Sequence, residues 1–484
     1  MSAVGYGVSD FVGGIASRHV AALRVVLVSY PVALALLTML ALGLGGELST
    51  GAVVWGALCG VGQAFGVWWF YAALGAGPIS VVSPLTAILV AGVPVGVGLA
   101  LGERPSTLAS LNPSGLMTLD FRDPDDCERA ARELARDGGV DAAVGVDEET
   151  AVAAARIAAS LGIARGNPPE AVAAARDKRI LRERLAAAGL PSPVWALAPL
   201  SAGADAASSR VPFPCVLKPT FLSGSRGVIR ANSAEEFRAA WDRVAAILAD
   251  PDVARRGGES ARSILVEEFV PGDEVALEGL LTGGRLDCLA IFDKPDPLDG
   301  PFFEETIYVT PSRKPAALQD AIVAAAGDAA RALGLREGPI HAEFRLSRAG
   351  PVALEVAART IGGLCGRALR FAGGVSLEEV VLRHALRMNE GKVEREQGAS
   401  GVMMIPIPGA GVLEEVRGLS AARAVPAIED VVISAHPGQR LVPLPEGSRY
   451  LGFVFARAGD PAAAEAALRR AHGMLEFRIT PGEE

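Results

Sequence analysis

Glu343 and Glu355 are the two residues of this sequence whose spacing points most directly to chemistry. They lie in two β-like runs, at 338–346 and 351–359. We expect a hairpin that places Ser347 opposite Pro351, so that the two glutamates also face each other, with Cβ atoms about 5 Å apart. Two carboxylates at that separation repel, and hard oxygen ligands of this kind suit Mg²⁺, with Mn²⁺ as the alternative ion. A solvated hairpin whose acids face water is the other interpretation.

The chain has only five lysines, although it is rich in arginine; they are Lys178, Lys218, Lys294, Lys314 and Lys392. Where arginine fills most cationic positions, a lysine is expected where a compact ammonium is needed, as in phosphate binding. Lys178 opens a predicted helix, and Lys218 ends an apolar predicted strand.

A loop with glycines and hydroxyls follows Lys218 directly. Its glycines let backbone N–H groups approach a polyphosphate closely, and its hydroxyls add donors. An ordinary hairpin loop is the alternative. The candidate phosphate-binding residues of this loop are Ser223, Gly224, Ser225 and Gly227.

A predicted strand at 264–268 runs into an acidic and then apolar turn at 269–274. Such a turn is able to hold a nucleotide base and its ribose. For the acids at the strand end, the alternative is simple solvation. The candidate residues are Glu267, Glu268, Phe269, Val270 and Glu274.

Upstream of these motifs, strands and helices alternate. We expect strands at 116–121 and 140–146 and helices at 124–137 and 149–161, and this rhythm predicts a parallel sheet. The sequence Asn167-Pro168-Pro169 marks a boundary.

The order of these elements, ending with Arg359, resembles that of the ATP-grasp carboxylate–amine ligases over about residues 116–480. The motifs Phe292–Pro297 and Phe303–Thr306, and the tail from Met403 through Phe453, are similar to the L-amino acid ligase branch. The resemblance implies an ATP-grasp fold of the α+β and α/β classes. The expected domains are a partial N-terminal βαβ domain at 106–166, an ATP-grasp domain at 167–396 and a C-terminal α+β domain at 397–484.

The resemblance also implies roles for the nucleotide-binding residues. Lys178 and Lys218 would bind the ATP phosphates, with loop 223–227 closing over them. Glu274 would bind the ribose, and adenine would be held by Glu267, Phe269 and Val270, next to Glu268.

A second group of roles concerns the metal ion and the acyl group. Glu343 and Glu355 would hold Mg²⁺, and Ala357 stands where many relatives have an asparagine, so we expect weaker or single-metal binding. The catalytic residues would be Lys218 and Arg359, the latter steadying an acyl-phosphate together with Gly362 and Gly363. Glu304 or Glu305 would bind the ammonium of an amino acid, and surface acids without a function are the alternative. His341 should share a face with Glu343, as a packed or a catalytic histidine.

The function expected is ATP-dependent joining of a carboxylate, an amino acid, to an amine. A biotin carboxylase-like activity is the alternative within enzymes, although no Met-Lys-Met biotinyl site is present. A transporter with an inert soluble domain is the alternative from another class. The net charge of −9 and the lack of a basic patch argue against nucleic acid as a partner, and the five scattered cysteines favour a reduced compartment. A homodimer is left open.

The first 105 residues have a different character. Uncharged apolar runs at 25–45, 52–74 and 79–101 are long enough to span a bilayer. The region resembles a truncated EamA-type drug/metabolite transporter repeat of about four helices, with buried helices of a soluble protein as the alternative. We expect an integral membrane segment, a cytoplasmic catalytic domain and a fused reading frame. However, by the positive-inside rule Arg18 and Arg24 place the first loop in the cytoplasm, and three further crossings would then leave the chain after Glu103 outside. A fifth helix, which the family has and this chain lacks, would return it to the cytoplasm.

Overall fold

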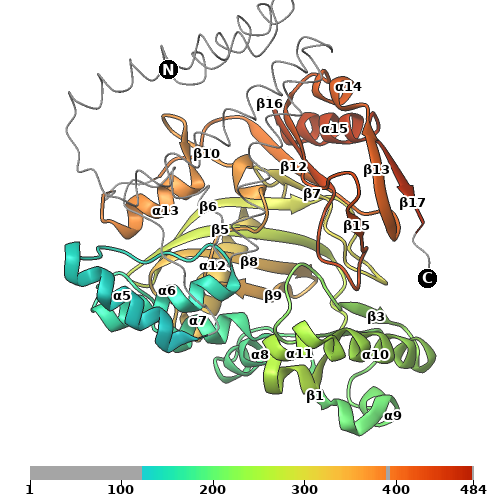
Figure 1. Cartoon of the computed structure of the whole chain (residues 1–484), viewed down its shortest axis with the longest axis horizontal. Helices are drawn as coiled ribbons and strands as arrows, with labels where there is room; N and C mark the ends of the chain where they lie inside the picture. The colour runs from blue at the N-terminus through green and yellow to red at the C-terminus, as the bar shows by residue number, and fades with distance from the viewer. Residues whose placement is uncertain (1–122, 389–392, 482–484) are drawn as a thin grey trace, which may run out of the picture. The chain divides into compact units, whose positions relative to one another are not determined.

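The computed structural model describes residues 123–388 and 393–481, which belong to one compact unit at 119–484 (Figure 1). Its first elements are α5 (Pro124–Gly138) and α6 (Glu148–Leu161), in agreement with the two predicted helices. Asp123 and Asp147 cap them by accepting hydrogen bonds from backbone N–H groups of the first turn.

The predicted strand at 140–146 does not form. These residues have no ladder partner among the described residues, and the other predicted strand, at 116–121, lies outside them. Every strand pair that the structure describes is antiparallel, so the described residues contain no parallel sheet. A strand without a neighbour gains no hydrogen bonds, whatever its sequence pattern.

A small sheet with the order β1-β4-β2-β3 forms the lower lobe in Figure 1. Its apolar core includes Phe237 and Trp241 of α10, which pack against the sheet. The elements of this lobe and of the helices that lead into it are α7 (Pro169–Arg176), α8 (Lys178–Ala187), β1 (Trp195–Pro199), α9 (Gly203–Ser208), β2 (Cys215–Lys218), β3 (Ile229–Ala231), α10 (Ala234–Ala249), α11 (Pro251–Gly257) and β4 (Ser263–Glu268).

An eight-stranded sheet with the order β14-β16-β12-β7-β6-β5-β8-β9 lies above this lobe in Figure 1. Because β12 pairs with β7, the sheet continues across the predicted domain boundary at 396–397. Its strands are β5 (Asp273–Thr282), β6 (Arg285–Lys294), β7 (Ile307–Thr310), β8 (Gly338–Ser347), β9 (Gly350–Ala357), β12 (Ala399–Ile405), β14 (Ile428–Ile433) and β16 (Gly452–Ala458).

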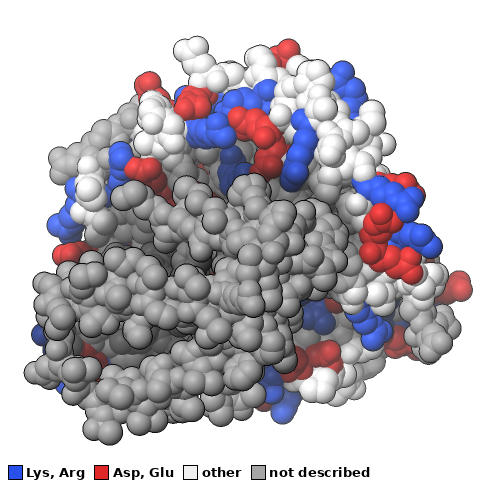
Figure 2. Space-filling view, turned by 45° about the horizontal axis from the view of Figure 1, so that its top comes forward, with Lys and Arg blue, Asp and Glu red and all other residues white. Residues whose placement is uncertain are grey.

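The remaining elements cover this sheet or extend from it. A three-stranded sheet with the order β15-β13-β17 lies near the C-terminus. On the surface that is not grey in Figure 2, positively and negatively charged side chains are interspersed. These elements are α12 (Ala316–Leu333), β10 (Arg370–Phe371), β11 (Val375–Ser376), α13 (Leu377–Ala385), β13 (Gly411–Arg417), α14 (Leu419–Arg423), β15 (Arg440–Leu441), α15 (Pro461–His472) and β17 (Glu476–Thr480).

The predicted membrane localisation needs correction. Within residues 123–388 and 393–481, no helix combines the length and the apolar character needed to cross a bilayer. The transporter-like helices were predicted for residues 1–105, which lie outside the described residues. The prediction of an integral membrane protein is therefore wrong for the part of the chain that the structure describes.

Candidate active site

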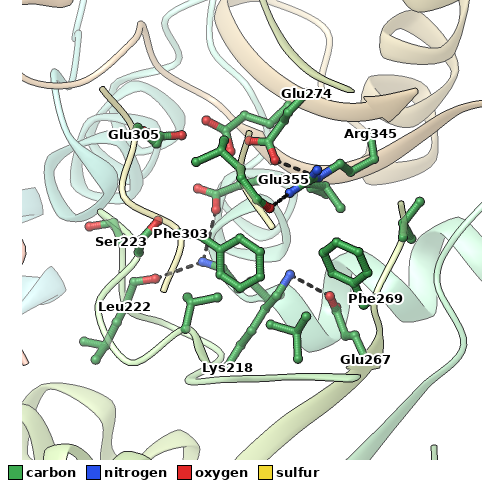
Figure 3. Close-up of a pocket in the computed structure, with 18 of the residues that line it drawn as sticks. Lys218, Leu222, Ser223, Glu267, Phe269, Glu274, Phe303, Glu305, Arg345 and Glu355 are labelled. Carbon is green, nitrogen blue, oxygen red and sulfur yellow. Dashed lines mark hydrogen bonds and ion pairs between the residues drawn. The ribbon is translucent and has the colours of Figure 1, made fainter. Parts of the chain in front are cut away.

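One cavity between the small sheet and the large sheet brings most of the predicted site residues together (Figure 3). Both lysines, the loop hydroxyls, the acidic turn and the opposed glutamates contribute to its wall. The predicted residues that line this first cavity are Lys178, Lys218, Ser223, Ser225, Glu267, Glu268, Phe269, Val270, Glu274, Glu305, Glu343 and Glu355. Five sequence motifs spread over 178 positions thus converge on one place.

Helix α8 delivers Lys178 to the cavity. Its buried residues are Lys178, Leu181, Arg182 and Leu185, a spacing that forms one face of a helix. The Lys178 ammonium donates to the carbonyl of Leu222 at 2.9 Å and lies 3.2 Å from Oε2 of Glu355. It therefore connects the loop after Lys218 with the glutamate pair.

Lys218 ends β2 and points at Glu267 of the neighbouring strand β4, with Nζ 2.7 Å from Oε2 (Figure 3). Glu267 is 1% exposed, so the solvated strand end considered for it is excluded. Burial would raise the pKa of Glu267, but the charges of Arg182 and Lys218 outweigh burial and lower that pKa to about 2. Its carboxylate is thus a fixed anion that holds Lys218 in place.

Sequence reasoning missed Arg182. This fully buried guanidinium donates to both carboxylate oxygens of Glu267, at 2.6 and 3.2 Å, and to the carbonyls of Ala353 and Leu354 in or beside the glutamate hairpin. Its position one helical turn after Lys178 was the available signal, because residues four apart lie on the same face.

The acidic turn forms an aromatic wall of the first cavity. Phe269 stacks on Phe303 with ring centroids 6.4 Å apart, and the Arg230 guanidinium lies 3.9 Å from the Phe269 centroid. Glu268 is exposed. Glu274 is buried, and its oxygens contact Lys294 at 2.7 Å and Arg345 at 3.0 Å, so the proposed ribose contact would have to be made beside these two cations.

The glycine-containing loop adopts the backbone conformation that its composition predicts. Gly224, Ser225 and Gly227 all have positive φ, of 62°, 54° and 73°. A Cβ on Gly227 would meet Pro219 at 2.7 Å, so this glycine is required sterically. Gly227 is buried, whereas Ser223 and Gly224 are exposed.

Glu343 and Glu355 face each other across β8 and β9, as predicted. The register at the turn differs from the prediction, because Ser347 pairs with Gly350 and Leu346 with Pro351. A β-bulge between Glu343 and Phe344 adds one residue to β9 and restores the predicted pairing of the glutamates.

Lys294 occupies a group of three carboxylates that the sequence did not connect. One oxygen each of Glu274, Glu305 and Glu343 lies within 4.8 Å of the others, a spacing that metal ligands could have. However, the Lys294 ammonium contacts all three, at 2.7 Å for Glu274 and 3.0 Å for Glu343 and in a short contact with Glu305. Burial would lower the pKa of Lys294, but these negative charges raise it well above its usual value, so the lysine stays charged.

The opposed glutamates have the chemistry that a hard cation requires. Burial would raise the pKa of each carboxyl, but Lys294 and His341 lower that of Glu343, and Lys178 lowers that of Glu355. Both side chains are therefore ionised oxygen donors on adjacent strands, which fits Mg²⁺. Their assignment as its ligands remains a prediction.

His341 is buried between two carboxylates. Its Nδ1 makes a short contact with Glu278, and its Nε2 lies 3.2 Å from Oε1 of Glu343. Burial would lower the pKa of His341, but the two glutamates raise it to about 10. This histidine is therefore a packed cation beside Glu343 that also lines the second cavity, and a catalytic role for it stays a prediction.

A second cavity adjoins the first one and contains Arg359, Gly362 and Gly363. The two cavities share Ser223, Ser225, Glu305, Glu343 and Glu355. The other walls of the second cavity come from the start of α6, from Tyr308 of β7 and from the C-terminal residues Ser434, His436, Gln439, Ser448, Arg449, Tyr450 and Phe453.

Arg359 is held by a residue that the sequence did not single out. Its guanidinium contacts Oε1 of Glu148 at 2.6 and 2.8 Å, from Nη2 and Nε, and also donates to the carbonyl of Thr360. Burial would lower the pKa of Arg359, but Glu148 raises it. The first turn of α6 thus fixes the predicted catalytic arginine.

The two candidate ammonium-binding glutamates differ. Glu305 lines both cavities, and burial together with the charge of Glu343 raises its pKa to about 7, against the effect of Lys294. Glu304 is not among the residues that line either cavity, and its carboxylate accepts a hydrogen bond from the backbone N–H of Ile407. Of the two, the geometry favours Glu305.

Comparison with known proteins identifies two segments. Residues 211–368 match the ATP-grasp domain, and residues 403–480 match the L-amino acid ligase C-terminal domain 2. Among solved structures, the chain is similar to an L-amino acid ligase from Bacillus licheniformis, with a TM-score of 0.64 and 27% identity over 74% of this chain and 86% of that one.

Curated relatives match shorter stretches. The chain is 28% identical over 320 residues to the uncharacterized protein y4rH of Sinorhizobium fredii. This match covers 65% of this chain and 64% of that protein. The chain is 30% identical over 237 residues to an alanine–anticapsin ligase of Bacillus subtilis, which covers 46% of this chain and 49% of that protein. The matches span less than two thirds of these relatives. The chain therefore has the ATP-grasp fold, and it contains an ATP-grasp domain at 211–368 and an L-amino acid ligase C-terminal domain at 403–480.

Proposed function

We propose that this chain is an ATP-dependent ligase that activates a carboxylate as an acyl-phosphate and joins it to an amine. The observation that carries the proposal is the junction of the two cavities at Ser223, Ser225, Glu305, Glu343 and Glu355. Phosphate-binding candidates line one side of this junction, and Arg359 lies on the other. A phosphoryl group has to pass from a nucleotide to an organic acid at such a place.

The first cavity would take ATP. The ATP phosphates would replace Glu355 as the partner of Lys178 and Glu267 as the partner of Lys218. The stacked rings of Phe269 and Phe303 would contact the base. Both lysines are already held by carboxylates, so little reorganisation is needed when a phosphate replaces one anion with another. Mg²⁺, or Mn²⁺, held by Glu343 and Glu355 would supply positive charge beside the phosphate oxygens.

The reaction would have two steps. A carboxylate oxygen attacks the γ-phosphorus of ATP, the bond to the bridging oxygen breaks, and ADP leaves with the electron pair. The amine nitrogen then attacks the acyl carbon, the C–O bond breaks, and phosphate leaves with the electron pair. The proton that the amine loses as the amide forms passes to the departing phosphate. Arg359 suits a bidentate grip on the acyl-phosphate oxygens, and Glu148 keeps its guanidinium oriented.

An amino acid is the proposed acid, for two reasons. Glu305 provides a carboxyl group at the cavity junction that could pair with an α-ammonium group. The alanine–anticapsin ligase and the L-amino acid ligase, to which the chain is similar, are named for amino acid substrates. The amine partner would enter through the second cavity, where the C-terminal residues form the wall.

A screen of amino acid pairs tests the proposal. The full-length chain is incubated with ATP, Mg²⁺ and each pair, and ADP formation is measured together with the mass of any condensed product. We expect ADP and product in equal amounts with at least one pair. ADP formation that depends on bicarbonate and not on amino acids would instead indicate a carboxylase-like reaction, and no ADP with any pair would contradict the ligase proposal.

A further inference from the structure

The loop after Lys218 is fastened to a segment more than 200 residues later in the chain. The backbone N–H of Gly227 donates to the carbonyl of Pro445 at 2.8 Å. The Nε of Arg226 donates to the carbonyl of Glu446 at 2.7 Å. Two carbonyls of the C-terminal domain thus hold the two residues that end the predicted phosphate-binding loop.

The Glu446 side chain extends this connection to α10 of the small-sheet lobe. Its two oxygens accept hydrogen bonds from Nε and Nη2 of Arg243, the latter at 2.9 Å. Such a two-point contact fixes direction as well as distance. The hydrogen bond from Arg243 lowers the pKa of Glu446, and burial has the smaller opposite effect. Both side chains are about two-fifths exposed, so the pair matters by its geometry more than by its strength.

The C-terminal segment is shaped to present these carbonyls. The N–H of Gly447 donates to the carbonyl of Pro443 at 2.8 Å, which closes a tight turn. A Cβ on Gly447 would lie 1.8 Å from the carbonyl oxygen of Val442, so another residue could not adopt this turn.

The same segment continues directly into the substrate side of the site. Ser448, Arg449 and Tyr450 line the second cavity, and a Cβ on Gly224 of the loop would lie 3.4 Å from Cβ of Ser448. The segment that holds the phosphate-binding loop is therefore also a wall of the cavity proposed for the substrates.

We propose that Arg243 and Glu446 are positioning residues that hold the phosphate-binding loop against the C-terminal domain. Through them, the closed position of the loop depends on the segment 443–450, which also borders the substrate cavity. The role of this contact in catalysis rests on the proposed function. If the loop binds ATP, its position would link ATP binding to the conformation of the segment that lines the substrate cavity. A loop that closes over a reacting group excludes water from it.

Proteolysis of the free protein tests the positioning without any assumption about activity. Trypsin can cut after Arg226 only when the loop detaches, so the rate of cleavage between Arg226 and Gly227 reports the open loop. The variants are Arg243→Glu, Glu446→Arg and the double charge exchange, all in the full-length chain. We expect each single variant to raise this rate by roughly fivefold or more, and the exchange to return it to within about twofold of the original.

The matched control is Arg238→Glu, which breaks another exposed ion pair of the same helix. Arg238 lies on α10 and contacts Asp205 at 2.6 Å, away from the loop. It should leave cleavage after Arg226 unchanged. The proposal is overturned if neither single variant raises the cleavage rate, if the control raises it equally, or if the charge exchange fails to restore it.

Kinetics then test the catalytic meaning. The single variants should raise KM for ATP and the share of ADP formed without ligated product, and the exchange should reverse both changes. An unchanged KM and product ratio alongside faster cleavage would overturn the link to ATP binding. If the unaltered protein forms no amino acid-dependent ADP, the ligase proposal fails, whereas the cleavage rates still decide whether Arg243 and Glu446 position the loop.

Discussion

Lys178 and Glu355 touch each other, with Nζ 3.2 Å from Oε2, although one was predicted to bind phosphate and the other a metal ion. In the free protein, each neutralises the other within a buried site. ATP and Mg²⁺ carry the same two kinds of charge as this pair. When they bind, phosphate oxygens could pair with Lys178 and the cation could bind Glu355. The charge of Lys178 lowers the pKa of Glu355, so the contact helps to keep this carboxyl ionised before the ligands arrive.

Glu355→Gln should reduce turnover at least about a hundredfold, because the proposed metal site loses one of its two carboxylates while the shape of the side chain is kept. The measurement is the rate of ADP formation with the best amino acid pair. Binding of Mn²⁺, followed by electron paramagnetic resonance in the presence of ADP, should weaken in parallel.

Glu429→Gln is the control for this variant. Glu429 lies on β14, and its side chain is 27% exposed, against 22% for Glu355. It pairs with Arg370 and Arg457 and does not line either cavity. It should keep turnover within about twofold. Unchanged turnover in Glu355→Gln would remove this residue from the metal site.

Lys218→Ala should raise KM for ATP by about 10- to 100-fold, the effect of losing one charge-assisted hydrogen bond to a phosphate. Arg182 would still hold Glu267, so folding should persist. The comparison is Lys314→Ala, a lysine that pairs with Asp273 and does not line the first cavity. An unaltered KM in the first variant would exclude Lys218 from nucleotide binding.

Glu267→Gln should destabilise the protein most at neutral pH. The pKa of Glu267 is about 2 in the folded chain, against an ordinary value of 4.5 in the unfolded chain. Its ionised form therefore stabilises the fold above pH 4.5, and this stabilisation is lost as the pH falls towards 2. Urea unfolding at pH 7 should therefore separate the variant from the original protein clearly, and the difference should shrink at pH 3. A difference that does not depend on pH would contradict the assignment of Glu267 as a buried anion.

The sequence predicted the glutamate pair correctly, but for a reason that was only partly right. The assumed turn register was off by one position, and a bulge in the hairpin compensated for it. Bulges have no reliable sequence signature, because they depend on the packing of both strands. The predicted strand at 140–146 is not formed. A pattern of residues shows a preference for strand, whereas a strand in a sheet also needs a neighbour to pair with.

The charged partners that hold the site residues in place were harder to foresee. Arg182 lies 85 positions from Glu267, and Glu148 lies 211 positions from Arg359. Lys294 lies 11, 20 and 49 positions from its three glutamates, and only the tertiary fold brings these groups together. Lys294 was noticed because lysine is rare in this chain, but its contacts with three carboxylates could not be derived from that. Sequence motifs predicted groups that line the two cavities, and the structure adds the charged partners that hold them.

Lys294→Met should strongly destabilise the protein, since removing one partner from a buried set of charges typically costs about 3–5 kcal/mol. Glu274 keeps Arg345 and Glu343 keeps His341, whereas the short contact of Glu305 with Lys294 is lost. The three carboxylates would then be free to share a divalent cation. Added Mg²⁺ should therefore raise the Tm of the variant more than that of the original protein, as measured by differential scanning calorimetry.

Lys314→Met provides the comparison, because it removes an equally long side chain whose partner Asp273 is exposed. Its Tm should change by at most a few degrees, with the same response to Mg²⁺ as the original protein. If Lys294→Met were as stable as this control, the carboxylates around it would have to be protonated or separated in solution. If it were unstable but unaffected by Mg²⁺, the three carboxylates would not form a cation site even without the lysine, and the ion would be left to Glu343 and Glu355.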